Sequence, residues 1–187
     1  IYRWLDFMKI KFVIPKGHLE NGTQVLLENA GYKMSGLART YRPNINDDGI
    51  ELKILRPQEI PILVAEGVHD IGITGKDWIY ETKADVKILL DLEFGWTKMV
   101  MAVPNEWKDI NTLSDLLNTF WDKQREVRIS TEYLNTATKY LKSNSEYQKY
   151  FQDAEPVVIT PWWRIGENPR LKIFLSFGAT EAKPPEN

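Results

Sequence analysis

The alternation of strand-like and helix-like segments over residues 9–90 is the feature that most constrains the fold of this chain. Lys9–Ile14 predicts a strand that ends at Pro15, and His18–Ala30 carries apolar residues at helical spacing. Ile50–Leu55 predicts the next strand. This order of elements is typical of a parallel sheet with helices on its faces, so the sequence predicts an α/β fold.

A similar pattern starts again after residue 104, so we predict two lobes, each a mainly parallel sheet flanked by helices. We assign residues 8–101 to lobe I, and residues 102–187 to lobe II and the start of a return to lobe I. Residues 1–7 are assigned to upstream or added sequence before a natural start at Met8. The other predicted helices are Pro57–Glu66, Lys76–Glu81, a helix capped by Asn111 or Thr112 and running to Trp121, and Glu132–Phe151; the other predicted strands are Asp70–Ile73, Val86–Leu90, Thr97–Val103, Val127–Ser130, Val157–Thr160 and Leu171–Phe177.

Composition excludes several classes of function. The formal net charge of -2 argues against strong non-specific binding to nucleic acid. The chain has no cysteine, which excludes disulfides, and its two histidines, His18 and His69, argue against a His-rich metal site. A Mg²⁺ ion bound mainly by phosphates stays open. No apolar run approaches the roughly 20 residues that cross a membrane, and no signal peptide is visible, so we expect a cytoplasmic location without membrane contact.

The stretch D-I-G-I-T-G-K-D invites comparison with a P-loop, which requires G-x-x-x-x-G-K-[ST]. With Gly75 as the second glycine, the first would fall at Asp70, and the position for Ser or Thr is occupied by Asp77. A P-loop is therefore excluded. What remains is a strand–turn–helix junction over Gly72–Gly75, which suits anion binding by backbone N–H groups. The alternative is that both glycines only permit a tight turn.

Basic residues follow two other predicted strands. P-K-G-H-L places Lys16, Gly17 and His18 after the first strand, and Arg56 comes directly after Leu55. Because parallel strands end at one edge of a sheet, we expect these side chains near the Gly72–Gly75 turn, where they would suit a polyphosphate. Arg39 and Arg42 are further candidates for the same role. The alternative for each is an ordinary solvated side chain.

Several motifs occur in the order and approximate spacing found in ATP phosphoribosyltransferase, the first enzyme of histidine biosynthesis. From about Met8 to its end, the chain resembles this family. The motifs are P-K-G-H-L (15–19), L-R-P-Q-E-I-P (55–61), D-I-G-I-T-G-K-D (70–77), D-L-E-F-G-W-T-K-M-V-M-A-V-P (91–104) and F-G-A-T-E-A (177–182).

The resemblance implies a two-lobed catalytic core similar to type II periplasmic binding proteins. It implies transfer of phosphoribosyl from phosphoribosyl pyrophosphate (PRPP) to N1 of the adenine of ATP, with Mg²⁺ and release of pyrophosphate. It also implies a homo-oligomer that histidine inhibits, directly or through a regulatory subunit. The alternative is a non-catalytic solute-binding protein or regulatory paralogue of the same fold.

The resemblance also carries roles onto single positions. Lys16 and Gly17 match the first basic loop of the family, in which His18 stands where an arginine is usual. Arg39 matches an arginine between the first helix and the second strand, with Arg42 as the alternative. Arg56 matches an arginine that reaches the nucleotide site.

The turn that lines the nucleotide site matches Asp70 through Gly75, with Gly72, Ile73, Thr74 and Gly75 as substrate contacts. Glu181 matches an acidic residue on the return to lobe I. We expect Glu181 or Asp70 to contact a ribose hydroxyl or the positive charge that develops in catalysis. The PRPP loop of the family is expected shortly after Asn187, so we expect the 187-residue chain to be truncated and inactive with PRPP by itself.

Overall fold

The computed structural model describes residues 9–37 and 39–183, apart from the side chain of Glu181. The chain forms two compact units, Ile1–Thr97 and Lys98–Asn187, each with its own sheet and helices. The lobe boundary expected from the sequence, after residue 101, lies a few residues beyond this division. Both sheets are mainly parallel and flanked by helices, which confirms the predicted α/β class.

A three-stranded parallel sheet forms the centre of the first unit. Its strands are β1 (Ile10–Pro15), β4 (Ile50–Leu55) and β5 (Ile71–Gly72), in the order β4-β1-β5. β1 is fully paired with β4, from Ile10 opposite Ile50 to Pro15 opposite Leu55. The carboxyl ends of all three strands therefore lie at one edge of this sheet.

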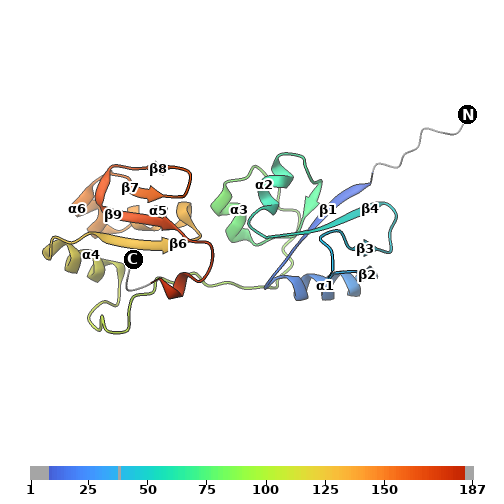
Figure 1. The fold of residues 1–187 in the computed structure, drawn as a ribbon, viewed down its shortest axis with the longest axis horizontal. Coiled ribbons are helices and arrows are strands. Elements are labelled where there is room, and N and C mark those ends of the chain that lie inside the picture. The colour runs from blue at the N-terminus through green and yellow to red at the C-terminus, as the bar shows by residue number, and fades with distance from the viewer. Residues whose placement is uncertain (1–8, 38, 184–187) are drawn as a thin grey trace, which may run out of the picture. The chain divides into compact units, whose positions relative to one another are not determined.

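Helices α1 (Glu20–Asn29), α2 (Ile60–Ala65) and α3 (Lys76–Thr82) flank these strands. Neighbouring β1 side chains point to opposite faces of the sheet. Ile14 packs in a buried cluster with Leu27 of α1. Val13, which also belongs to β1, and Ile60, which belongs to α2, both lie beside Gly72. Helices thus cover both faces, with α1 on one side and α2 and α3 on the other (Figure 1).

The segment 33–46 forms a small antiparallel pair, β2 (Met34–Ser35) with β3 (Asn44–Ile45), which the sequence analysis did not predict. The Asn46 side chain fixes it by accepting from Lys33 N at 2.6 Å and donating to Gly31 O at 3.2 Å.

Two predicted strands of the first part of the chain are wrong. Val86–Leu90 and Thr97–Val103 have no regular secondary structure. A strand needs a partner backbone, and within the described ranges nothing pairs with β5 on its outer side. Leu90 and Val100 are accordingly exposed, although their β-branched and apolar neighbours gave these segments strand character.

A four-stranded sheet in the order β6-β9-β7-β8 forms the second unit. β9 (Asn168–Leu175) is parallel to β6 (Val127–Thr131) and to β7 (Pro156–Ile159), while β8 (Arg164–Ile165) forms an antiparallel edge. A short 3-10 helix, η1 (Thr180–Ala182), follows the sheet.

The helices of this unit are α4 (Leu113–Asp122), α5 (Leu134–Lys142) and α6 (Ser145–Phe151). Thr112 caps α4 through a reciprocal capping box with Asp115. This confirms one of the two caps predicted from the sequence, Asn111 or Thr112. The single helix predicted over Glu132–Phe151 is wrong, because Asn144 interrupts it. The Asn144 side chain accepts from the N–H groups of Glu146 and Tyr147 and so starts a second helix.

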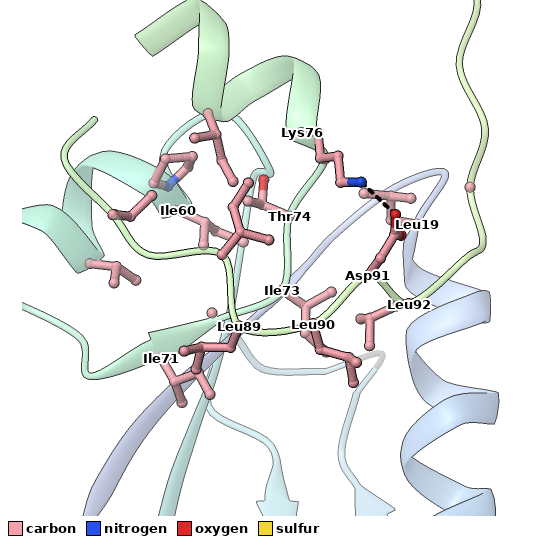
Figure 2. Close-up of a pocket in the computed structure, with 18 of the residues that line it drawn as sticks. Leu19, Ile60, Ile71, Ile73, Thr74, Lys76, Leu89, Leu90, Asp91 and Leu92 are labelled. Carbon is pink, nitrogen blue, oxygen red and sulfur yellow. Dashed lines mark hydrogen bonds and ion pairs between the residues drawn. The ribbon is translucent and has the colours of Figure 1, made fainter. Parts of the chain in front are cut away.

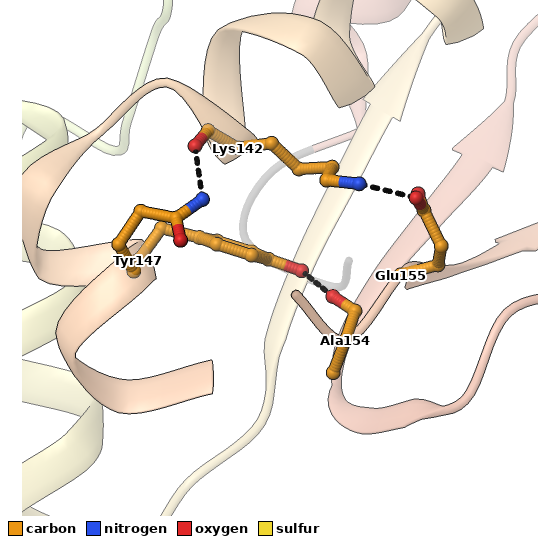
Figure 3. A network of polar contacts seen from close by, with 5 residues as sticks. Lys142, Tyr147, Ala154 and Glu155 are labelled. Atoms are coloured by element: carbon orange, nitrogen blue, oxygen red, sulfur yellow. Dashed lines mark hydrogen bonds and ion pairs between the residues drawn. The ribbon is translucent and has the colours of Figure 1, made fainter. Parts of the chain in front are cut away.

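A buried tyrosine of α6 is hydrogen-bonded to the loop that leads from α6 to β7 (Figure 3). Tyr147 is fully buried, and its hydroxyl donates to Ala154 O at 2.5 Å. Burial raises the pKa of this phenol, so it stays a neutral donor. Lys142 pairs with Glu155 beside it, and Gln148 Nε2 donates to Lys142 O at 2.7 Å. This network supports the fold of the second unit.

Candidate functional site

Three loops meet at the carboxyl ends of β4, β1 and β5 in the first unit. The loop after β1 is tied to β4, because Lys16 N donates to Leu55 O at 2.8 Å. The turn after β5 is tied to the loop after β4, because the Thr74 hydroxyl donates to Pro57 O at 2.7 Å. The sequence analysis expected these loops at one edge of the sheet, and the hydrogen bonds place them there.

The two glycines of the turn after β5 serve close packing. A Cβ at Gly72 would lie 2.5 Å from Ile60 Cγ2 and 2.9 Å from Val13 Cγ1, so the backbone of β5 touches α2 and β1 directly. Gly75 is the N-cap of α3 in an extended conformation, and a Cβ there would meet Asp77 Oδ1 at 2.0 Å. Neither glycine has a positive φ. The turn is therefore compact because of its neighbours rather than because of left-handed geometry.

A cavity of about 530 Å³ lies beside this turn, within the first unit (Figure 2). The segment 86–97 forms one wall and the Gly72–Gly75 turn another. Most of its lining is apolar, and the polar or charged residues that contribute to it include Asp70, Thr74, Lys76, Asp77, Lys87, Asp91 and Glu93. A mainly apolar cavity that also carries polar groups is the usual form of a small-molecule site.

Lys76 and Asp91 form an ion pair across the mouth of this cavity (Figure 2). The hydrogen bond from Lys76 lowers the pKa of Asp91 and raises the pKa of Lys76, so both stay charged near neutral pH. Asp91 also accepts from Glu93 N at 3.1 Å. Both side chains are about half exposed, so the pair orients the segment after Asp91 more than it stabilises the fold.

The same segment is anchored on α1 by its aromatic residue. A Cβ at Gly22 would lie 2.6 Å from Phe94 Cδ2, and a Cβ at Gly95 would lie 2.1 Å from Leu19 Cδ2. Phe94 and Gly95 therefore lie directly on the first turns of α1. The sequence analysis assigned no role to these residues or to Asp91, because no periodic pattern marks them; only their place in the D-L-E-F-G motif could have indicated them.

The loop after β1 presents its predicted residues at the surface. Lys16, Gly17 and His18 are all exposed. The Lys16 ammonium lies 5.0 Å from the centroid of the Tyr41 ring. Gly17 has a φ of 93°, which favours glycine, and its N–H donates to the carboxylate of Glu20 at 3.2 Å. This loop thus offers a cation to an anion, while its backbone donor is bonded to Glu20.

The three predicted arginines have different surroundings. Arg56 is exposed at the end of β4, beside the loops described above. Arg39 is also exposed, and its backbone N–H donates to Gly36 O at 3.0 Å. Arg42 pairs with Glu51 at 2.8 Å, which draws its guanidinium toward the amino-terminal half of β4 and away from the loops.

Asp70 lies on the amino-terminal side of β5. Its carboxylate accepts from Lys11 N at 2.7 Å, and its own N–H donates to Lys11 O at 3.0 Å. The structure therefore does not bring the Asp70 carboxylate together with Lys16. Glu181, the other expected catalytic residue, belongs to η1 in the second unit, and its side chain lies outside the described part of the chain.

In residues 9–37 and 39–183, no group of three or more His, Asp or Glu side chains could hold a metal ion. None of the helices in these ranges combines the length and apolar character that crossing a bilayer requires.

Comparison with known proteins gives consistent results. The family model HisG: ATP phosphoribosyltransferase matches residues 56–187. The ATP phosphoribosyltransferase of Chlorobaculum parvum is 36% identical over 182 residues, which cover 95% of this chain and 51% of the relative. That of Pelotomaculum thermopropionicum is 35% identical over 159 residues, covering 81% and 52%. The chain thus spans about half the length of the curated relatives it matches.

A solved structure, described as the ATP phosphoribosyl transferase (HisG:HisZ) complex from Thermotoga maritima, has a similar fold. It matches with a TM-score of 0.55 and 19% identity, over 95% of this chain and 69% of that one. At this identity the likeness supports the arrangement of parallel sheets and flanking helices, and nothing finer.

Proposed function

The chain belongs to the ATP phosphoribosyltransferase family, and on this basis we propose that it is the nucleotide-binding core of an enzyme that transfers phosphoribosyl from PRPP to N1 of the adenine of ATP. Pyrophosphate is the leaving group, and the reaction is the first step of histidine biosynthesis. The alternative, a non-catalytic solute-binding or regulatory paralogue, is not favoured because the relatives carry the transferase name.

The observation that carries this proposal is the junction of three βα loops beside one cavity, made by the Thr74–Pro57 and Lys16–Leu55 hydrogen bonds. Displacement of pyrophosphate at an anomeric carbon requires two polyanions to be held together and the charge of the leaving group to be neutralised. That task calls for basic side chains and backbone N–H donors on fixed loops rather than for a strong nucleophile.

In this proposal Lys16, His18 and Arg56 bind phosphate groups, and Gly17 lets a phosphate approach the backbone. The apolar cavity beside Gly72–Gly75 receives the nucleotide. Arg39 contributes a further guanidinium to the polyphosphate. The roles of Lys16, His18 and Arg56 are supported by the exposure of these side chains in the loops after β1 and β4.

We give the acidic candidates different roles. Asp70 joins β5 to β1 through Lys11, so its effect on the reaction is through the position of the Gly72–Gly75 turn. Glu181 contacts a ribose hydroxyl or the developing positive charge. Arg42 stays with Glu51 and orders the segment before β4.

The full enzyme, in this proposal, has the two-lobed architecture of type II periplasmic binding proteins and works in the cytoplasm as an oligomer. A regulatory subunit and inhibition by histidine are part of the proposal, and the T. maritima complex of two kinds of chain supports the subunit. Since no acidic or histidine cluster in the described ranges fits a Mg²⁺ ion, Mg²⁺ enters with the substrate phosphates.

The proposal is tested by incubating the protein, with any residues that the native gene adds after Asn187, with ATP, PRPP and Mg²⁺. Formation of N1-phosphoribosyl-ATP with an equal amount of pyrophosphate is the expected result. The 187-residue chain alone is expected to bind ATP. Absence of ATP binding by this chain would overturn the proposal, and binding of ATP without turnover by the full native protein would favour the paralogue.

A further inference from the structure

Lys16 lies against an exposed aromatic ring at the proposed phosphate end of the site. Its Nζ is 5.0 Å from the centroid of the Tyr41 ring, and Tyr41 is 61% exposed. Both backbones are fixed to the end of β4, because Lys16 N donates to Leu55 O at 2.8 Å and Ile54 N donates to Tyr41 O at 2.9 Å. The ring and the ammonium therefore lie on two segments that are both hydrogen-bonded to the end of β4.

Two other cations of the first unit are paired with carboxylates. Arg42 pairs with Glu51, and Lys76 pairs with Asp91. In the part of the chain that the structure describes, no carboxylate pairs with Lys16. An aromatic face attracts an ammonium through its quadrupole, but it carries no net charge and leaves the N–H donors free for an anion.

We propose that Tyr41 is a positioning residue, which orients the Lys16 ammonium for contact with the phosphate groups of the substrate. The inference rests on the proposed function, in which Lys16 binds phosphate. The ring limits the rotamers of a long, flexible side chain before the substrate arrives, so less conformational freedom is lost on binding. A carboxylate in the place of the ring would also order Lys16 but would compete with the phosphate for it.

The experiment measures binding of ATP and of inorganic pyrophosphate to the 187-residue chain by calorimetry. Tyr41→Leu removes the ring, and Tyr41→Phe keeps it. Tyr140→Leu is the matched control, because Tyr140 is 57% exposed and lies in the second unit. We expect Tyr41→Leu to raise both dissociation constants about two- to fivefold, with Tyr41→Phe near the parent value and Tyr140→Leu unchanged.

A spectroscopic measurement separates positioning from a general effect on structure. In the ligand-free chain, ring current from Tyr41 should shift the Lys16 Cε methylene protons upfield, and Tyr41→Leu should remove that shift while Tyr41→Phe retains it. Lys16→Ala completes the set, with an expected increase of the dissociation constants by about tenfold.

The outcomes separate the inference from the proposal on which it rests. If Lys16→Ala weakens binding while Tyr41→Leu does not, or if the upfield shift is absent, the positioning role is overturned and the phosphate role of Lys16 stands. If Lys16→Ala leaves both dissociation constants unchanged, the phosphate role proposed for Lys16 fails, and the role of Tyr41 fails with it.

Discussion

The Thr74 hydroxyl donates to the carbonyl of Pro57, so the turn after β5 is joined to the loop after β4 over the end of the strand between them. The Thr74 side chain thus fixes the relative position of two motifs that the chain shares with the family, L-R-P-Q-E-I-P (55–61) and D-I-G-I-T-G-K-D (70–77). Several expected outcomes depend on this contact and on its neighbours.

Thr74→Val keeps the shape of the side chain and removes the donor. The Pro57 carbonyl then loses its partner, so the local free energy of opening should fall by about 1 kcal/mol. The measurement is native-state hydrogen exchange at Ile73 N, which donates to Val13 O. Thr82→Val is the control, since the Thr82 hydroxyl bonds only to carbonyls of its own helix. Equal exchange rates at Ile73 in Thr74→Val and the parent would contradict this account.

Gly72→Ala should destabilise the first unit by about 1–3 kcal/mol, because the new methyl group overlaps Ile60 and Val13. Denaturant unfolding of this variant, of Ile60→Ala and of the double variant gives a double-mutant cycle. We expect a coupling energy that favours the double variant, since removal of the Ile60 side chain makes room for the methyl group. Strict additivity would show that the contact does not limit position 72.

Acidification should weaken the first unit through His69. This side chain is 7% exposed, and in the described ranges neither ring nitrogen has a hydrogen-bond partner. Burial lowers its pKa, and Lys53 and Lys11 lower it further, against smaller opposing effects of Glu51 and Asp70.

The sign follows from proton linkage. With a folded-state pKa below the ordinary value of 6.5, the unfolded chain binds the proton first, so the free energy of unfolding falls as pH drops below 6.5. One such group gives a slope of at most about 1.4 kcal/mol per pH unit. Unfolding measured between pH 7.5 and 5 should show a smaller slope in His69→Leu than in the parent. Parallel pH curves for His69→Leu and the parent would refute the assignment.

Arg56→Ala should raise the KM for ATP or PRPP about tenfold in the full native enzyme, because a charge-assisted contact to phosphate is lost. Arg56 is exposed, so its loss should leave the fold intact. Arg128→Ala in the second unit is the control, because Arg128 is exposed and pairs with nearby Glu126. Steady-state kinetics measure the KM for ATP and for PRPP. Unchanged KM values for Arg56→Ala would show that Arg56 does not bind either substrate.

Features with local causes were predictable from the sequence. Pro15 ends β1 because proline terminates central strands, and Thr112 with Asp115 starts α4 because the two side chains satisfy each other's backbone donors. The loops with Lys16 and Arg56 were placed at one edge because parallel strands leave no other arrangement. The start of α6 at Asn144 was also predictable, because asparagine is a common N-cap residue. The spacing of the aromatic residues on both sides of Asn144 favoured one continuous helix instead.

Features that depend on distant partners were not predictable. Val86–Leu90 has the composition of a strand, but its conformation depends on a pairing backbone that composition does not report. The contact of Tyr41 with Lys16 depends on the register of Tyr41 beside Ile54, and no spacing rule connects positions 16 and 41. The ion pair of Arg42 with Glu51 likewise appears only once the chain before β4 is folded.

The hydrogen bond from Gly17 N to the Glu20 carboxylate means that the first basic loop already holds an anion of its own. Glu20 acts as a built-in competitor, which a ligand must displace before its phosphate reaches this donor. A multiply charged phosphate is attracted to Lys16 more strongly than a monoanion such as chloride, so it should compete better with Glu20 for this donor. The loop would then bind multiply charged phosphates in preference to small monoanions. We predict that Glu20→Gln weakens this preference, so that chloride competes measurably with pyrophosphate binding in the variant and not in the parent.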